Sequence, residues 1–188
     1  MWSLLWYWTL VSIHKPYCVL VSCLSDCQVV TVSKSTRRPL LIPDWWKTRY
    51  SSAVVDNDRL IVAAEEVPST LSTSRYDMKV PWNEIDSYGH TNYQSYVRFC
   101  FDAAADAVNA GRYATFDGDI LRHNVATIQS LYESESRAND ILTIISWQSP
   151  DDPRELHFNI HKDNGTLLFH SRMQFYPLTE DASKIWAY

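Results

Sequence analysis

The sequence predicts an α+β domain in which a curved antiparallel sheet wraps around one long helix. Two observations support this fold class: an apolar stripe with helical period runs over residues 91–109, and segments of alternating apolar and polar residues lie before and after it. A helical stripe repeats every three or four residues, whereas a half-buried strand alternates with period two. One strand, a long helix and a meander of strands bury their apolar faces together when the sheet covers the helix.

The long helix is the clearest element of the sequence. Thr91 and Gln94 have the spacing of a capping box, which predicts that the Thr91 hydroxyl caps the helix N-terminus. Gly111 is placed to end the helix, so we expect about 19 residues, or a length of about 28 Å. The apolar positions recur three and four residues apart, at Tyr93, Tyr96, Val97, Cys100, Phe101, Ala104, Ala107 and Val108.

The strands are predicted from alternation and from the turns between them. Residues 76–80 alternate between apolar and polar side chains and form the strand before the helix. The pair Asn164–Gly165 has the composition of a tight hairpin turn. After the helix we expect four strands, over residues 125–135, 140–147, 156–161 and 167–175.

Composition and charge exclude several classes of function. The chain has 188 residues and four glycines, the first of which is Gly89, so glycine-rich phosphate loops, dinucleotide fingerprints and Gly-x-Ser-x-Gly elbows are absent. A net charge of −5 with one basic doublet, Arg37–Arg38, argues against a nucleic-acid partner. The apolar segment Met1–Ile13 is too short to span a membrane and lacks the basic start of a secretory signal. We expect a cytoplasmic protein, and leave organellar and secreted locations open.

The loop before the helix carries the residues of greatest chemical interest. It reads Asp86-x-x-Gly89-His90-x-Asn92-x-x-x-Tyr96. This pattern resembles the active-site loop of hotdog-fold acyl thioesterases, above all the acyl-ACP and acyl-CoA thioesterases. The order of strand, loop, long helix and meander is also the order of the hotdog fold. The resemblance implies hydrolysis of a fatty acyl-CoA or acyl-ACP to a free fatty acid and a thiol.

The resemblance implies three catalytic side chains. Asp86 would activate or orient water, and His90 would serve as a hydrogen-bond donor or a base. Glu135, on a later strand, takes the acidic position of the family pattern. Each residue also has a simpler interpretation: Asp86 could bond the amides of its own loop, His90 could pack under the helix start, and Glu135 could be solvated.

Four further residues are expected to bind the substrate. Gly89 has no Cβ, so an acyl group can approach the backbone, and the amides before a helix N-terminus would stabilise the oxyanion. Tyr88 stands where the plant-type family pattern has Asn. Asn92 and Tyr96 would support the loop and line the pocket.

We expect neither a metal nor a cofactor. His157 and His161 lie on one face of a predicted strand, four residues apart. A zinc site needs at least three protein ligands, and the sequence offers no evident third one beside this pair.

The chain divides into four parts: a remnant of a first hotdog unit (1–50), a linker (51–73), a hotdog thioesterase-like domain (74–177) and a C-terminal tail (178–188). The first part resembles the exit from the first unit of double-hotdog thioesterases, and it contains an extended stretch that ends at an aromatic anchor, Trp45–Trp46. A lone unit leaves a strand edge exposed, so we expect a homodimer or pairing with another hotdog unit. Two other functions stay open, namely a non-catalytic hotdog module that binds acyl-CoA or a partner subunit, and a hotdog dehydratase.

Overall fold

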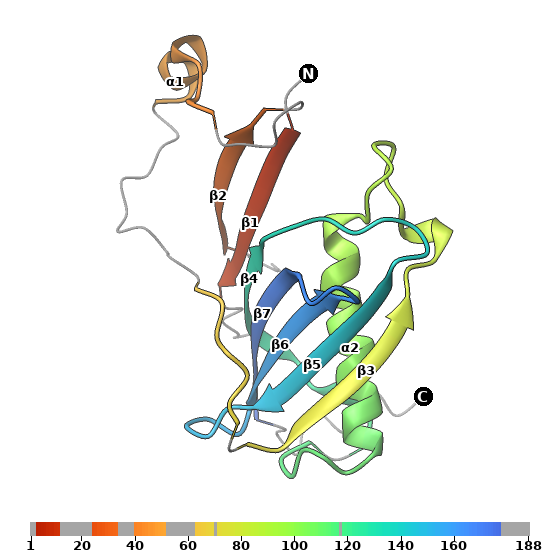
Figure 1. The fold of residues 1–188 in the computed structure, drawn as a ribbon. Coiled ribbons are helices and arrows are strands. Elements are labelled where there is room, and N and C mark those ends of the chain that lie inside the picture. Colours follow the sequence, from red (N-terminus) through yellow and green to blue (C-terminus); the bar gives the residue numbers. More distant parts are fainter. Residues whose placement is uncertain are drawn as a thin grey trace, which may run out of the picture.

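The computed structural model contains a seven-stranded antiparallel sheet (Figure 1). It describes residues 3–11, 24–33, 40–51, 63–69, 71–116 and 118–177. The strands are β1 (Ser3–Val11), β2 (Leu24–Val32), β3 (Thr73–Lys79), β4 (Val125–Tyr132), β5 (Ile141–Gln148), β6 (Glu155–Lys162) and β7 (Leu167–Phe175). They lie in the order β2-β1-β4-β7-β6-β5-β3. With helix α2 (Tyr93–Asn109) on one face of the sheet, the architecture is α+β, as the sequence predicts.

The five strands β3–β7 follow the alternating segments of the sequence. Most boundaries shift by one to three residues, and the shift that bears on the site is that β4 ends at Tyr132, so Glu135 lies in the segment after the strand. The ladder stops there since the N–H groups of Glu133 and Ser134 both donate to the carbonyl of Leu168, at 2.9 and 3.2 Å. In the part of the chain that the structure describes, no helix is long and apolar enough to cross a membrane.

Helix α2 begins one residue later than the capping-box prediction requires. Its N-cap is Asn92, whose Oδ1 accepts a hydrogen bond from the Gln94 N–H at 3.1 Å. The Thr91 hydroxyl lies 2.6 Å from the Ser136 hydroxyl instead. The predicted capping box is therefore wrong, because a tertiary partner takes the hydroxyl that the box would have used.

The core lies between α2 and the sheet. Its members from α2 include Tyr96, Phe99, Cys100, Ala103, Ala104 and Ala107, and those from the strands include Leu142, Ile144, Leu156, Phe158, Ile160, Phe169, Met173 and Phe175. Burying one such large side chain stabilises the fold by about 1.5–3 kcal/mol. Since neighbouring residues of a strand point to opposite faces, the residues that alternate with this set in β6 and β7 lie on the sheet face away from α2.

The described residues among the first fifty add two paired strands and a short helix. Strand β1 pairs with β2 along its length, and Thr9–Val11 pairs with Thr127–Gln129 of β4. The edge of β4 is thus partly covered by β1 of the same chain, and β2 and β3 are the outer strands. Helix α1 (Asp44–Tyr50) contains Trp45 and Trp46, which are 63% and 37% exposed, and Trp46 lies against Tyr50 of the same helix with ring centroids 4.7 Å apart.

Several predicted segments lie wholly or partly outside the described residues: the doublet Arg37–Arg38, most of the linker (52–62 and 70) and the tail (178–188).

Candidate active site

The loop between β3 and α2 is held together by Asp86. Its Oδ1 accepts hydrogen bonds from the backbone N–H of Tyr88 at 2.8 Å and of His90 at 3.1 Å. The backbone closes the same turn, because the Asp86 N–H donates to the His90 carbonyl at 2.8 Å. Gly89 adopts a φ of +80°, which disfavours any residue with a side chain. Asp86 therefore has the loop-bonding role that the sequence left as its alternative interpretation.

The amides expected to stabilise an oxyanion are engaged inside this loop. The Gly89 N–H donates to the Asp86 carbonyl at 3.1 Å, and the His90 N–H donates to the Asp86 carboxylate. The side chain of Tyr88, at the Asn position of the family pattern, is 68% exposed. In this conformation the loop does not direct the Gly89 and His90 amides at a ligand.

His90 and Glu135 are brought together by two separate segments. His90 Nε2 lies 3.3 Å from Glu135 Oε2, and the two side chains are 21% and 32% exposed. The contact joins the loop before α2 to the segment that follows β4. The pair is partly shielded and still reachable from solvent, which suits a group that must meet a substrate.

Ser136 fixes the segment that carries Glu135. Its N–H donates to the hydroxyl of Tyr96 at 2.9 Å, its hydroxyl lies 2.6 Å from that of Thr91, and its carbonyl accepts from the Thr91 N–H at 2.8 Å. Tyr96 is 2% exposed, stacks on Phe169 at 5.5 Å between ring centroids, and has its pKa raised by burial. Sequence reasoning missed Ser136, because no local spacing links it to Thr91, 45 residues away.

Glu84 anchors the start of α2. Its carboxylate pairs with Arg98 and accepts a hydrogen bond from the Ser95 hydroxyl at 2.7 Å. The Glu84 carbonyl also accepts from the N–H of Asn92 at 2.8 Å. The hydrogen bonds from Arg98 and Ser95 lower the pKa of Glu84, so this buried carboxyl stays ionised. Asn92 is therefore held both by its cap and by its backbone.

Comparison with known proteins rests on structure. No family model and no curated protein matches the chain. A putative oleoyl thioesterase from Lactobacillus plantarum has 16% identity and a TM-score of 0.69, over 96% of this chain and 77% of that one. The 12:0-ACP thioesterase from Umbellularia californica has 16% identity and a TM-score of 0.67, over 95% and 76%.

An acyl-ACP thioesterase from Bacteroides thetaiotaomicron is also similar, with 14% identity and a TM-score of 0.56 over 94% of this chain and 76% of that one. This chain has the hotdog fold of the acyl-ACP thioesterases. At such low identity the likeness establishes the fold and does not establish the reaction. The reaction has to be argued from the residues of the site. In this fold His90 belongs to the loop that leads into α2, and Glu135 belongs to the segment after β4.

Proposed function

We propose that this protein hydrolyses fatty acyl thioesters, with an acyl-CoA or acyl-ACP as substrate and a free fatty acid and a thiol as products. The observation that carries the proposal is the contact of 3.3 Å between His90 Nε2 and Glu135 Oε2. A carboxylate held by a hydrogen-bond donor, and accessible to solvent, is suited to act as a general base toward water. The hotdog fold, shared with solved acyl-ACP thioesterases, supports the same reaction.

In the proposed reaction Glu135 takes a proton from a water molecule while the water oxygen attacks the thioester carbonyl carbon. The carbon–sulfur bond then breaks, the sulfur leaves as a thiolate, and Glu135 returns the proton to it. His90 holds the Glu135 carboxylate in position through its Nε2–H. The positive end of the α2 dipole favours negative charge on the carbonyl oxygen near the start of the helix.

Asp86 acts in this proposal as a positioning residue. Because its Oδ1 accepts two loop amides, the carboxylate sets the backbone that carries His90. Gly89 allows the positive φ of the same turn. The role of Asp86 as the base itself remains the alternative, and the Asp86→Asn variant discussed below separates the two.

The proposal includes a domain arrangement. Residues 74–177 form the hotdog domain with α2 as its single central helix, residues 1–50 are the remnant of a first unit, and residues 51–73 link them. A second hotdog unit, from a homodimer or another chain, completes the acyl pocket. The continuation of the sheet from β4 into β1 supports the idea that β4 is the strand where two units meet.

A second candidate function is a non-catalytic hotdog module that binds acyl-CoA or a partner subunit. It is favoured by the engagement of the Gly89 and His90 amides with Asp86, and by an exposed Tyr88 where the family pattern has Asn. A module of this kind would bind an acyl-CoA without releasing thiol.

The test is a thiol-release assay over a series of acyl-CoA chain lengths, with calorimetric binding in parallel. We expect release by the wild type, and a loss of about 10²–10⁴-fold in Glu135→Gln, as for removal of a general base. Glu133→Gln is the matched control, because Glu133 is an exposed carboxylate two residues earlier in the same segment. Equal release by the wild type and Glu135→Gln would contradict the mechanism, and tight binding without release by the wild type would favour the module.

A further inference from the structure

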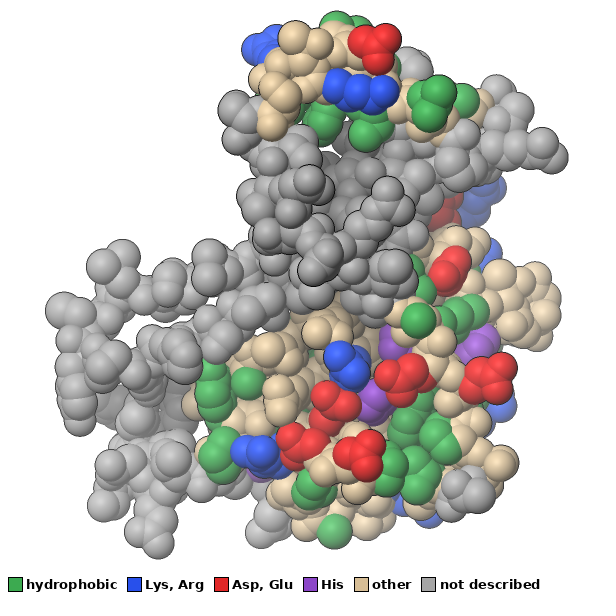
Figure 2. All heavy atoms as spheres, turned by 90° about the vertical axis from the view of Figure 1, so that its left-hand side faces the viewer, with side chains coloured by type: hydrophobic (Ala, Val, Ile, Leu, Met, Phe, Trp, Pro, Cys, Tyr) green, Lys and Arg blue, Asp and Glu red, His purple; other side chains and the backbone are tan. Residues whose placement is uncertain are grey.

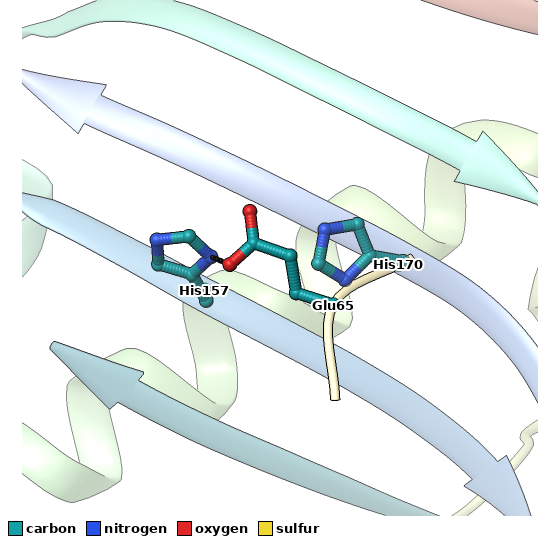
Figure 3. Close-up of side chains that lie close together, drawn as sticks. All are labelled: Glu65, His157 and His170. Carbon is teal, nitrogen blue, oxygen red and sulfur yellow. Dashed lines mark ion pairs between the residues drawn. The ribbon is translucent and has the colours of Figure 1, made fainter. Parts of the chain in front are cut away.

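A second cluster of histidine and carboxylate side chains lies on the sheet face away from α2. His157 on β6, His170 on β7 and Glu65 from the 63–69 segment place one potential ligand atom each within 4.8 Å of one another (Figure 3). Figure 2 shows histidine side chains among acidic and basic ones on the face that it presents. The cluster is separate from the His90–Glu135 pair, and its argument does not depend on the proposed function.

The protonation of His157 follows from its partners. His157 Nε2 lies 2.9 Å from Glu155 Oε1, and since a carboxylate only accepts, Nε2 carries a hydrogen. Nδ1 then has its lone pair toward Glu65 Oε2, which is 3.2 Å away. Nδ1 is buried and has no hydrogen-bond partner among the described residues. A lone pair facing a carboxylate oxygen in a buried site calls for a cation between them.

The protonation of His170 follows from a chain of two hydrogen bonds. The side-chain Nδ2 of Asn159 donates to the Glu65 carbonyl at 2.8 Å, which orients the amide and leaves Oδ1 as an acceptor. His170 Nδ1 lies 2.7 Å from that oxygen and therefore carries the hydrogen, so Nε2 has the lone pair.

We infer that Glu65, His157 and His170 bind a divalent transition-metal ion, with Zn²⁺ as the best chemical match. Imidazole nitrogen and carboxylate oxygen are ordinary zinc ligands at about 2.0–2.2 Å. Ligand atoms at those distances in a tetrahedron are about 3.3 Å apart, close to the 3.2 Å between His157 Nδ1 and Glu65 Oε2.

Each histidine already has the outer partner that a zinc ligand requires. Metal-binding histidines typically donate their other ring N–H to a carboxylate or carbonyl oxygen, which fixes the tautomer. Glu155 provides this contact for His157, and the Asn159 carboxamide provides it for His170. The ion would tie the 63–69 segment to β6 and β7, because Glu65 is the one ligand from outside the sheet.

Arg172 supplies the competing explanation for the cluster. Its Nη1 lies 3.9 Å from Glu65 Oε1 and its Nε lies 3.7 Å from Glu155 Oε2. This cation, with a proton on His157 Nδ1, could balance both carboxylates without a metal. The two explanations make opposite predictions for added Zn²⁺.

The experiment is a titration of the full chain, stripped with a chelator, with Zn²⁺ by calorimetry and with Co²⁺ by visible absorption. We expect one ion per chain, and affinity lowered at least about tenfold by Glu65→Gln or His170→Gln. His161→Gln is the matched control, because His161 lies on the same strand and face as His157 and outside the cluster. It should bind as the wild type does.

Two results would overturn the inference: no binding by the wild type, or binding that survives both Glu65→Gln and His170→Gln. Glu65→Gln keeps the test valid if the histidine variant fails to fold, because the Glu65 side chain is 46% exposed and the change preserves its shape. Circular dichroism before each titration verifies the fold.

Discussion

Two histidine–carboxylate contacts in this molecule have nearly the same length and different surroundings. His90 Nε2 lies 3.3 Å from Glu135 Oε2, and His157 Nδ1 lies 3.2 Å from Glu65 Oε2. The His90 side chain is 21% exposed, whereas that of His157 is 4% exposed and stacks on Trp147. Access to solvent, rather than distance, separates a pair that can meet a substrate from one that can hold an ion.

The two histidines also differ in the groups that fix them. His157 has a second carboxylate, Glu155, at 2.9 Å from its other ring nitrogen. The His90 backbone is fixed instead by Asp86, and Glu135 is positioned by its neighbour Ser136. In the sheet-face cluster (Glu65, His157 and His170), contacts to the histidine rings themselves hold the side chains. In the loop site (His90 and Glu135), hydrogen bonds of the backbone and of a neighbouring residue hold them.

The largest expected effect is a loss of activity in a variant of the His90–Glu135 pair that a variant on the opposite sheet face does not share. His90→Gln should lower kcat/KM for thioester hydrolysis by about 10²–10⁴-fold, because the general base loses the donor that positions it. His161→Gln, on the other face of the sheet, should leave kcat/KM near the wild-type value. Steady-state thiol release measures both. A similar loss in both variants would show that the activity falls because the protein is destabilised, and would contradict a specific role of His90.

The next effect tests how the loop site is positioned. Tyr96→Phe removes the hydroxyl that accepts the Ser136 N–H, so the free energy of unfolding should fall by about 1–3 kcal/mol and kcat should fall with it. Tyr113→Phe removes another buried hydroxyl, which donates to Ser146 at 2.6 Å, and should lower stability alone. Urea unfolding and thiol release on the same samples distinguish the two. Unchanged kcat in a folded Tyr96→Phe would contradict the positioning role.

A smaller effect tells apart the two roles of Asp86. Asp86→Asn keeps an oxygen that can accept the Tyr88 and His90 amides, so activity should stay within about tenfold of the wild type, whereas Asp86→Ala should lose more. If Asp86 were the base, the two variants would lose activity equally. The kcat values of the two variants at one pH, with their melting temperatures as a control, decide the matter.

The smallest effect is a pH dependence of stability from Glu84. Arg98 and Ser95 lower the pKa of this carboxyl in the folded state. Its contribution is therefore present above the unfolded value, near 4.5, and is lost as the pH falls through the lower folded value. The difference in unfolding free energy between the wild type and Glu84→Gln should shrink on acidification below that range. A difference that grows instead would contradict the assigned direction.

Most of the fold could be predicted from the periodicity of apolar residues. The loop residues of the candidate site, from Asp86 to Tyr96, could be predicted from one motif. The apolar stripe of α2 and the alternation of β3–β7 depend on local spacing, so one sequence reveals them. The N-cap was predicted incorrectly because the Thr91 hydroxyl bonds Ser136, a partner that local spacing does not specify. Asp86 illustrates the same limit, because its position in the motif does not show whether its carboxylate activates water or accepts hydrogen bonds from its own loop.

The cluster of Glu65, His157 and His170 could not be predicted from the sequence for a related reason. The spacing of His157 and His161 drew attention to β6, but the cluster takes its second histidine from β7 and its carboxylate from the 63–69 segment. In the register of the two strands, His170 lies opposite Asn159, between the two histidines of β6. Strand pairing, and not spacing along one strand, brings the potential ligands together.

The most direct test of the central claim is a double-mutant cycle on the His90–Glu135 pair. The kcat/KM values of His90→Gln, Glu135→Gln and the double variant are measured with the acyl-CoA that the wild type hydrolyses fastest. If the two side chains act as one unit, the double variant will lose no more activity than the more impaired single variant. Losses that multiply would show that the two residues act independently and would contradict the account.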